Sequence, residues 1–171
     1  LLALCATLAL SAASLAHAEP VSYKVDPTHT FATFEISHFG ASVIRGRFDR
    51  KEGTITLDRA AGTGKIDISI DPASVSTGVP GLDKHMQNAD LFDVAAHPTV
   101  RFESTAVKFD GDKVTEVQGR LTLKGKTHPV TLTARQFGCY DHPMLKRQVC
   151  GGDFEATIDR TLWDLGYGTQ M

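Results

Sequence analysis

Polar and apolar residues alternate within the stretch Asp26-Pro27-Thr28-His29-Thr30-Phe31-Ala32-Thr33-Phe34-Glu35-Ile36-Ser37-His38-Phe39-Gly40. Between residues 32 and 38 the even positions are mostly apolar and the odd positions are polar. Because side chains alternate across a strand, this period of two predicts a strand with one dry face and one wet face. Turn residues bound it on both sides, and His38 falls on its dry face.

The same two-sided pattern recurs along most of the chain. Ile66, Ile68 and Ile70 alternate with polar residues and predict a half-buried strand. Alternation also predicts strands over residues 100–107, 114–123, 130–135 and 154–159, with Val100, Phe102, Ser104 and Ala106 sharing one face and Phe154, Ala156 and Ile158 sharing another. Gly53 is predicted to turn a hairpin between strands at 43–50 and 54–58.

Residues 72–98 interrupt the alternation with prolines and glycines. Residues 82–88 predict about two turns of helix, and Asp90–Ala96 predict a further short turn capped by Asp90. Many short strands joined by tight turns, without βαβ alternation, predict an all-β antiparallel sandwich or barrel. A barrel is favoured because closure removes exposed sheet edges.

The first 18 residues contain no Asp, Glu, Lys or Arg and end Ala16-His17-Ala18. This pattern predicts a secretory signal peptide over residues 1–18, cut before Glu19, and a single domain over residues 19–171. A membrane anchor is the alternative, but the apolar run is shorter than the ~20 residues that a span needs.

Two cysteines, Cys139 and Cys150, follow the signal peptide. Export predicts a disulfide between them, which would contribute on the order of 3 kcal/mol. A redox-active pair or a zinc site with His142 is less favoured, because no Cys-x-x-Cys or second pair of ligands is present. If the cysteines lie directly opposite each other, regular pairing would place the polar Arg135 opposite the apolar Phe154, a mismatch of one residue. This predicts a bulge at Gly151-Gly152.

Charge and motifs exclude several functions. The net charge of -2 argues against a nucleic-acid partner, which would need a basic stripe. No His-Glu-x-x-His or Gly-x-Ser-x-Gly occurs, so the sequence predicts no catalytic residue and no metal site. Asp26 and His29 are expected to fix the opening turn. Asp83 and His85 are expected either to orient a ligand head group or to cap the helix.

Four ordered segments carry a family resemblance. They are Asp26-Pro27-x-His29-Thr30-x-x-x-Phe34-x-Ile36-x-His38-x-Gly40, Asp83-x-His85 with Leu91-Phe92-Asp93, Pro98-Thr99-Val100-x-Phe102-x-Ser104, and Gly119-x-Leu121-Thr122-Leu123-x-Gly125-x-Thr127-x-Pro129-Val130. Together with Ile158-Asp159-Arg160, they make residues 20–170 similar to the YceI family.

The resemblance implies a lipocalin-like antiparallel β-barrel of about eight strands, with a short helical insertion near residues 80–96. It also implies a periplasmic protein that holds a polyisoprenoid, an isoprenoid quinone or a similar lipid and uses no other cofactor. Two departures stand out. The cysteine pair is not part of the family pattern. The family usually has one more strand after the segment matching residues 163–168, so barrel closure and the lining of one side of the pocket are expected to depend on it.

The predicted ligand-binding residues are apolar positions on dry faces and on the insertion, together with His38, which could bond a ligand head group or a buried carbonyl. They are Phe34, Ile36, His38, Phe48, Ile68, Leu82, Met86, Leu91, Phe92, Phe102, Leu121, Leu132 and Phe154. The 72–98 insertion is expected to form a mouth or lid, or alternatively a plug. A ligand-free structural or interaction barrel and an enzyme acting on an isoprenoid lipid are the alternative functions. Transient contact with a membrane or a membrane protein, and a homodimer, are left open.

Overall fold

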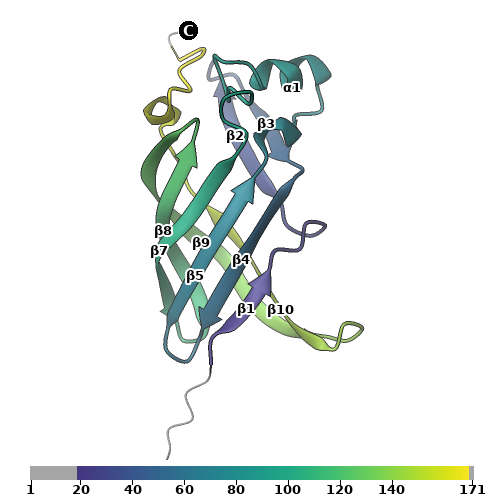
Figure 1. Ribbon diagram of the computed structural model, residues 1–171, viewed down its shortest axis with the longest axis vertical. Coiled ribbons are helices and arrows are strands. Elements are labelled where there is room, and N and C mark those ends of the chain that lie inside the picture. The colour runs from purple at the N-terminus through teal and green to yellow at the C-terminus, as the bar shows by residue number, and fades with distance from the viewer. Residues whose placement is uncertain (1–18, 170–171) are drawn as a thin grey trace, which may run out of the picture.

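The computed structural model describes residues 19–169, so the signal peptide predicted over residues 1–18 lies outside the described residues. Two antiparallel sheets make up most of the fold (Figure 1). The large sheet has the spatial order β1 (Val21–Lys24), β4 (Lys51–Asp58), β5 (Thr63–Ile70), β7 (Val100–Asp110), β8 (Lys113–Leu123), β9 (Lys126–His142) and β10 (Arg147–Glu155). The small sheet has the order β2 (Ala32–His38), β3 (Ser42–Phe48) and β6 (Val75–Ser76). The helical elements are η1 (Pro72–Ser74), α1 (Pro80–Met86) and η2 (Arg160–Trp163).

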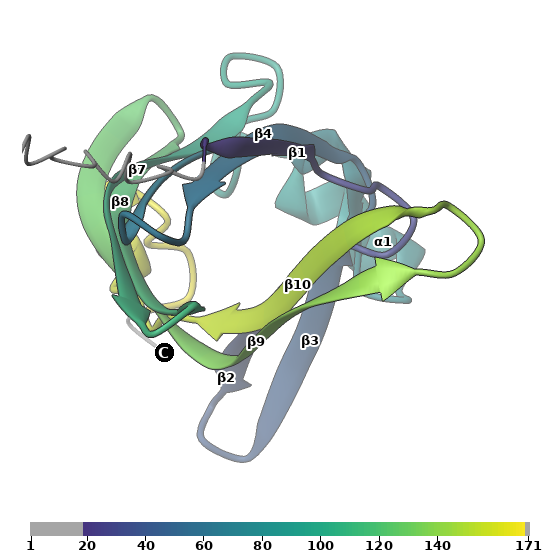
Figure 2. The same cartoon turned by 90° about the horizontal axis from the view of Figure 1, so that it is seen from below.

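The large sheet curls strongly into a half-barrel (Figure 2). β1 and β10 are its outer strands, and no main-chain pairing joins them within residues 19–169. Their side chains do meet. The Tyr23 hydroxyl donates to Gln148 Oε1 at 2.9 Å, and Arg59 Nη2 donates to the same oxygen at 3.0 Å. The predicted all-β antiparallel barrel fold is confirmed in the form of a half-barrel, whose two edges are joined by side-chain hydrogen bonds.

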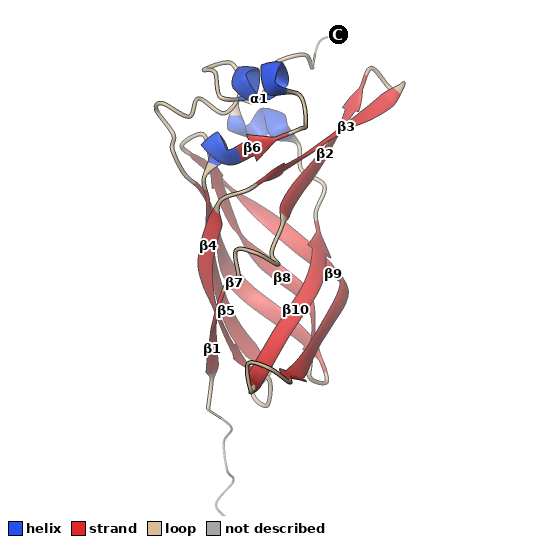
Figure 3. Ribbon diagram, turned by 90° about the vertical axis from the view of Figure 1, so that its right-hand side faces the viewer, coloured by secondary structure: helices blue, strands red, loops and turns tan. Residues whose placement is uncertain are grey.

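The half-barrel has two unlike ends (Figure 3). α1 and η2 lie at one end, which we call the helical end. The turns that join β4 to β5, β7 to β8 and β9 to β10 lie at the other, which we call the hairpin end. None of the helices in the described part of the chain is long and apolar enough to cross a membrane.

Buried apolar side chains lie toward both ends of the half-barrel. Leu57, Val114 and Val117 come from the strand segments nearest the hairpin end. Trp163 of η2 lies at the helical end and is 1% exposed. Its Nε1 donates to the Leu121 carbonyl at 3.1 Å. η2 therefore packs its indole against the inner side of β8, and the core closes from both ends.

The predicted hairpin around Gly53 is wrong. β4 runs unbroken over residues 51–58, and Gly53 pairs with Ile68 of β5. β3 ends at Phe48 and belongs to the other sheet. Lys51 is a buried strand residue rather than part of a turn, because it pairs with Ile70 of β5; its ammonium donates to the Asp49 carbonyl at 3.1 Å. Polar residues beside a glycine resemble a turn in sequence, but here their tertiary contacts place them in a strand.

In two further strands, the structure differs from the prediction of which side chains are buried. In β7 the register shifts at Thr105, so Val107 is buried and Ala106 is exposed, the reverse of the prediction. β10 ends at Glu155, short of the strand predicted over residues 154–159, and Ile158 is exposed. Strand geometry stops there because Asp159 starts η2 as its N-cap.

The predicted disulfide between Cys139 and Cys150 is confirmed, and the two residues pair directly opposite each other. The predicted bulge is present at a different place. Pairing stays regular through Gly151 and Gly152, and the extra residue is Arg135 on the facing strand. Shifting the register there aligns Phe154 with Ala134, which restores the match between apolar faces.

Gly152→Ala is expected to lower the free energy of unfolding by about 1–3 kcal/mol, because the added Cβ would lie 2.6 Å from the Gln136 carbonyl oxygen and 2.8 Å from the Phe154 ring. Gly151→Ala is the matched control, since its Cβ would meet no atom within 4 Å. Urea denaturation of both variants measures the difference. Equal losses for the two variants would contradict the observed register.

Candidate functional site

The inner face of the half-barrel forms one apolar cluster. Its buried members are Leu57, Ile66, Val100, Phe102, Val107, Val114, Val117, Leu123, Val130, Trp163 and Leu165. Partly buried apolar side chains pack against them, namely Tyr23, Ile55, Ile68, Ile70, Leu91, Phe92, Phe109, Leu121, Leu132, Phe137 and Phe154. The second group comes from strands all around the sheet and from the insertion, so part of the inner apolar surface remains in contact with solvent.

Seven of the predicted ligand-binding residues belong to this cluster. They are Ile68, Leu91, Phe92, Phe102, Leu121, Leu132 and Phe154. Phe34 and Phe48 of the small sheet join it through aromatic contacts. The Phe48 ring lies 5.4 Å from the Phe92 ring, and the Phe34 ring lies 5.7 Å from that of Phe48. The insertion and both sheets thus contribute to one continuous apolar surface.

Four predicted residues lie elsewhere. Ile36, Leu82 and Met86 are half-buried but are not members of the cluster. His38 is exposed and packs edge-on against Phe39, with ring centroids 4.6 Å apart. Its predicted position on a dry face is wrong because it is the last residue of β2, where the strand runs beyond the elements that cover its inner side.

Sequence reasoning missed several members of the cluster, most notably Phe137 and Trp163. Phe137 packs near Phe154, with ring centroids 6.5 Å apart. The bulge at Arg135 reverses the alternation just before Phe137, which hides it from a period-two search. The only signal for Trp163 was its residue type, because a large aromatic side chain is rarely left in water.

The insertion at the helical end is held by its own polar side chains. Asp83 accepts hydrogen bonds from the Thr77 backbone N–H at 2.7 Å and from the Thr77 hydroxyl at 2.6 Å. His85 Nε2 bonds Asp90 Oδ2 at 3.0 Å, and this contact lowers the pKa of Asp90. Asp90 therefore does not cap a second helical turn as predicted. Asp83 and His85 are both engaged within the insertion and its surroundings.

Lys124, in the turn between β8 and β9, connects the insertion to the segment after η2. Its ammonium donates to the Ala89 carbonyl at 2.7 Å and to the Asp164 carbonyl at 3.2 Å. The His85 ring also meets the Tyr167 ring edge-on at 4.7 Å. These contacts close the helical end with side chains, without strand pairing.

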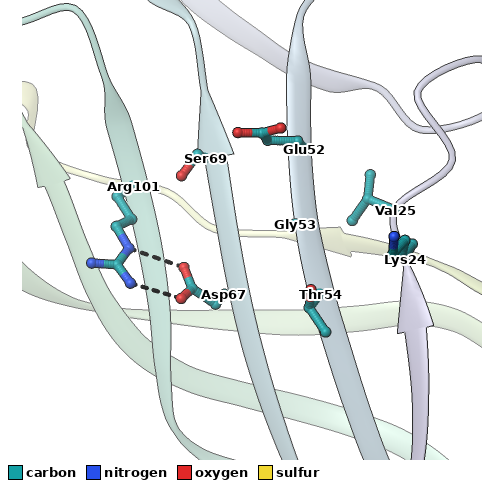
Figure 4. Close-up of a pocket in the computed structure, with 8 residues that line it drawn as sticks. All are labelled: Lys24, Val25, Glu52, Gly53, Thr54, Asp67, Ser69 and Arg101. Atoms are coloured by element: carbon teal, nitrogen blue, oxygen red, sulfur yellow. Dashed lines mark hydrogen bonds and ion pairs between the residues drawn. The ribbon is translucent and has the colours of Figure 1, made fainter.

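A hollow of about 620 Å³ lies on the outer face of β1, β4, β5 and β7 (Figure 4). Arg101 donates to both carboxylate oxygens of Asp67, at 3.0 and 2.7 Å. This pair lowers the pKa of Asp67 and raises the pKa of Arg101. Charged and polar side chains line the hollow, so it does not suit an apolar ligand.

A second hollow, of about 450 Å³, lies on the small sheet. Phe34 forms part of its wall, and the ring covers Gly46 of the neighbouring strand. Arg45 donates to Glu35 at 2.7 Å beside it. This hollow is therefore lined by the apolar ring of Phe34 and by the Arg45–Glu35 ion pair.

Residues 19–169 contain no group of three or more His, Cys, Asp or Glu side chains that could hold a metal ion. Asp26 and His29 form the opening turn that the sequence predicted. Asp26 accepts hydrogen bonds from the Thr28 hydroxyl at 2.6 Å and from the Thr28 backbone N–H at 2.8 Å, while His29 Nδ1 lies 2.8 Å from its other oxygen. Chiefly through the Thr28 hydroxyl, and then through His29, these bonds hold the pKa of Asp26 well below its usual range.

The chain is similar in sequence and in fold to known proteins. A family model described as the YceI-like domain matches residues 23–171. Protein YceI of Escherichia coli O157:H7 is 40% identical over 141 residues, which cover 81% of this chain and 72% of that protein. The Campylobacter jejuni YCEI protein superposes with a TM-score of 0.63 at 25% identity, covering 87% of this chain and 86% of that one. Burkholderia cenocepacia BcnA superposes with a TM-score of 0.65 at 25% identity, covering 85% and 87%.

Thr28→Val is expected to raise the pKa of Asp26 toward its ordinary value of 3.8, because it removes the hydroxyl donor. A depressed folded-state pKa contributes stability that is present above the unfolded value and is lost as pH falls through the folded value. The variant should therefore lose less stability on acidification than the parent. NMR titration of the Asp26 carboxyl measures the shift, and Thr33→Val is the control. An unchanged Asp26 titration in Thr28→Val would contradict the assigned bonds.

Proposed function

The chain belongs to the YceI-like family, and we propose that it is a periplasmic carrier for a long apolar ligand. The ligand would be a polyisoprenoid, an isoprenoid quinone or a similar lipid. It would lie against the inner face of the half-barrel, between the large sheet and the insertion.

The main support for a ligand is that many inner apolar side chains are only partly buried. Ile68, Leu121 and Leu132 face a cluster of apolar residues, yet each keeps part of its surface in water. A filled interior would bury them, as it buries Val117, which is 1% exposed. A ligand that covers about ten methylenes there would gain about 8 kcal/mol before the costs of association.

The insertion is proposed to form one wall of the ligand site. Leu91 and Phe92 follow α1 and pack into the inner cluster, and Phe92 meets Phe48 of the small sheet. Leu82 and Met86 lie on α1 outside that cluster, where they would meet the ligand only near an entrance at the helical end. Lys124 ties the insertion down from the opposite side.

Binding, rather than catalysis, fits the positions of the polar groups. Lys51 and Ser74 are the buried polar or charged residues within the described part of the chain, and each makes a hydrogen bond to backbone. The histidines at the helical end pack against Asp90, Gly125 and Trp163. These histidines make contacts that stabilise the fold, and the inner face offers a ligand mainly apolar side chains.

A periplasmic location is supported by the cross-strand disulfide. Cys139 and Cys150 are bonded, and such bonds persist in oxidising compartments. The signal peptide predicted at residues 1–18 accords with this location. Export would place the carrier between membranes, where an apolar ligand needs a protein to shield it from water.

Leu132→Trp is expected to weaken uptake of a long-tailed ubiquinone at least tenfold, because the indole would take the space of two or more ligand methylenes at about 0.8 kcal/mol each. Thr131→Trp is the matched control, since Thr131 is the preceding residue and is exposed. Co-elution of the quinone with protein in gel filtration, followed by extraction and quantification, measures uptake.

Circular dichroism and thermal unfolding would first establish that both tryptophan variants are folded. Equal uptake by a folded Leu132→Trp and by Thr131→Trp would remove Leu132 from the ligand wall. Failure of the parent protein to take up any quinone would favour a ligand-free interaction barrel.

A further inference from the structure

The end of the β9–β10 hairpin leaves the body of the half-barrel. β9 pairs with β8 only as far as Thr133, and from there to His142 it pairs with β10 alone. A two-stranded ribbon is marginally stable in water without further support. The Cys139–Cys150 bridge supplies that support, and Gln148 adds its bond to Tyr23 of β1. The disulfide therefore braces the ribbon beyond Phe137, its last residue toward the tip on β9 that packs against the apolar cluster.

The tip of this ribbon is ordered by hydrogen bonds of its own. His142 Nδ1 accepts from the backbone N–H groups of Met144 and Leu145, each at 3.2 Å. The Lys146 backbone N–H donates to the His142 carbonyl at 2.9 Å. These bonds order the backbone of the turn that carries Met144 and Leu145.

What the tip presents is apolar. Met144 is 82% exposed, the highest value among the large apolar side chains of the described residues. Leu145 is 52% exposed and Tyr140 is 56% exposed. Apolar side chains gathered on an ordered projection indicate a binding surface, because solitary exposed residues are common but clustered ones are not.

Positive charge adjoins this apolar tip. Lys146 and Arg147 are exposed, and within residues 19–169 neither has a carboxylate within 4.0 Å of its charged nitrogens. The nearby Asp141 lies on the other face of the ribbon from Tyr140, beside Gln148. A cationic tip on a chain of net charge -2 is a local departure that complements an anionic surface.

The shape of the tip selects between a protein and a lipid partner. A stable protein interface buries about 1,200 Å² or more, which a narrow two-stranded projection with three apolar side chains does not offer. A bilayer accepts a narrow apolar wedge, places tyrosine at the level of the head groups and attracts lysine and arginine to anionic lipids.

We propose that the tip defined by residues 140–147 inserts into the surface of an anionic lipid bilayer and docks the protein there. Met144 and Leu145 enter the acyl boundary, Tyr140 lies among the head groups, and Lys146 and Arg147 contact lipid phosphates. This docking surface goes beyond the proposed carrier function and does not depend on it, since the tip is remote from the helical end (Figure 3).

Sedimentation with vesicles of phosphatidylethanolamine and phosphatidylglycerol tests the proposal. The parent protein should sediment with these vesicles and bind less as salt rises. Met144→Asp combined with Leu145→Asp should weaken binding more than tenfold, because it removes the apolar insertion. Lys146→Gln and Arg147→Gln should each weaken it about fivefold.

Phe39→Asp is the matched control, because Phe39 is 63% exposed in the turn of the β2–β3 hairpin, away from the hairpin end. It should bind vesicles like the parent. Circular dichroism and the mass of the intact disulfide form establish that each variant is folded.

Three outcomes would overturn the proposal. The parent could fail to bind the vesicles, the double aspartate variant could bind as well as the parent, or Phe39→Asp could lose binding while the double variant keeps it. A Tyr140→Trp variant adds an independent readout. Its tryptophan emission should shift to shorter wavelength with these vesicles and stay unchanged with pure phosphatidylcholine at high salt.

Discussion

The strict alternation of side chains across each strand is the constraint on which the rest of the structure depends. One face of the large sheet must remain apolar through seven strands, so a single extra residue in any strand would turn its apolar side chains outward. The structure absorbs such residues locally. Register shifts at Thr105 of β7 and at Arg135 of β9 return Val107 and Phe154 to the inner face. Without these shifts, the inner cluster would be interrupted on both sides of the sheet.

The inner face divides its apolar residues between two tasks. The buried ones, such as Val117 and Trp163, supply stability in the ordinary way. The partly buried ones, which include Ile68, Leu121 and Leu132, form the surface that we assign to the ligand. At the two sheet edges and at the helical end, where strands do not pair, side-chain hydrogen bonds of Gln148 and Lys124 hold the segments together.

Much of this fold could be predicted from the sequence, because alternation reports directly on which face is buried. The strands around Phe34 and Ile68, the disulfide and seven members of the inner apolar cluster followed from it or from the family resemblance. The errors have a common physical cause. The indole of Trp163 bonds a carbonyl 42 residues away, and Gly53 is a strand residue because β5 pairs with it. Such positions are set by tertiary partners that no local pattern contains. The bulge at Arg135 could be predicted only in part. The mismatch of polar and apolar faces indicated that a bulge must occur, but not which of the two strands contains it.

We infer that a ligand occupies the partly buried inner face in the cell. Native mass spectrometry of protein isolated from the periplasm, followed by solvent extraction, would detect that ligand. We expect one long-chain apolar molecule, bound at a near-stoichiometric level and released by organic solvent. A protein that is empty when isolated, and that also takes up no added isoprenoid quinone, would rule this out.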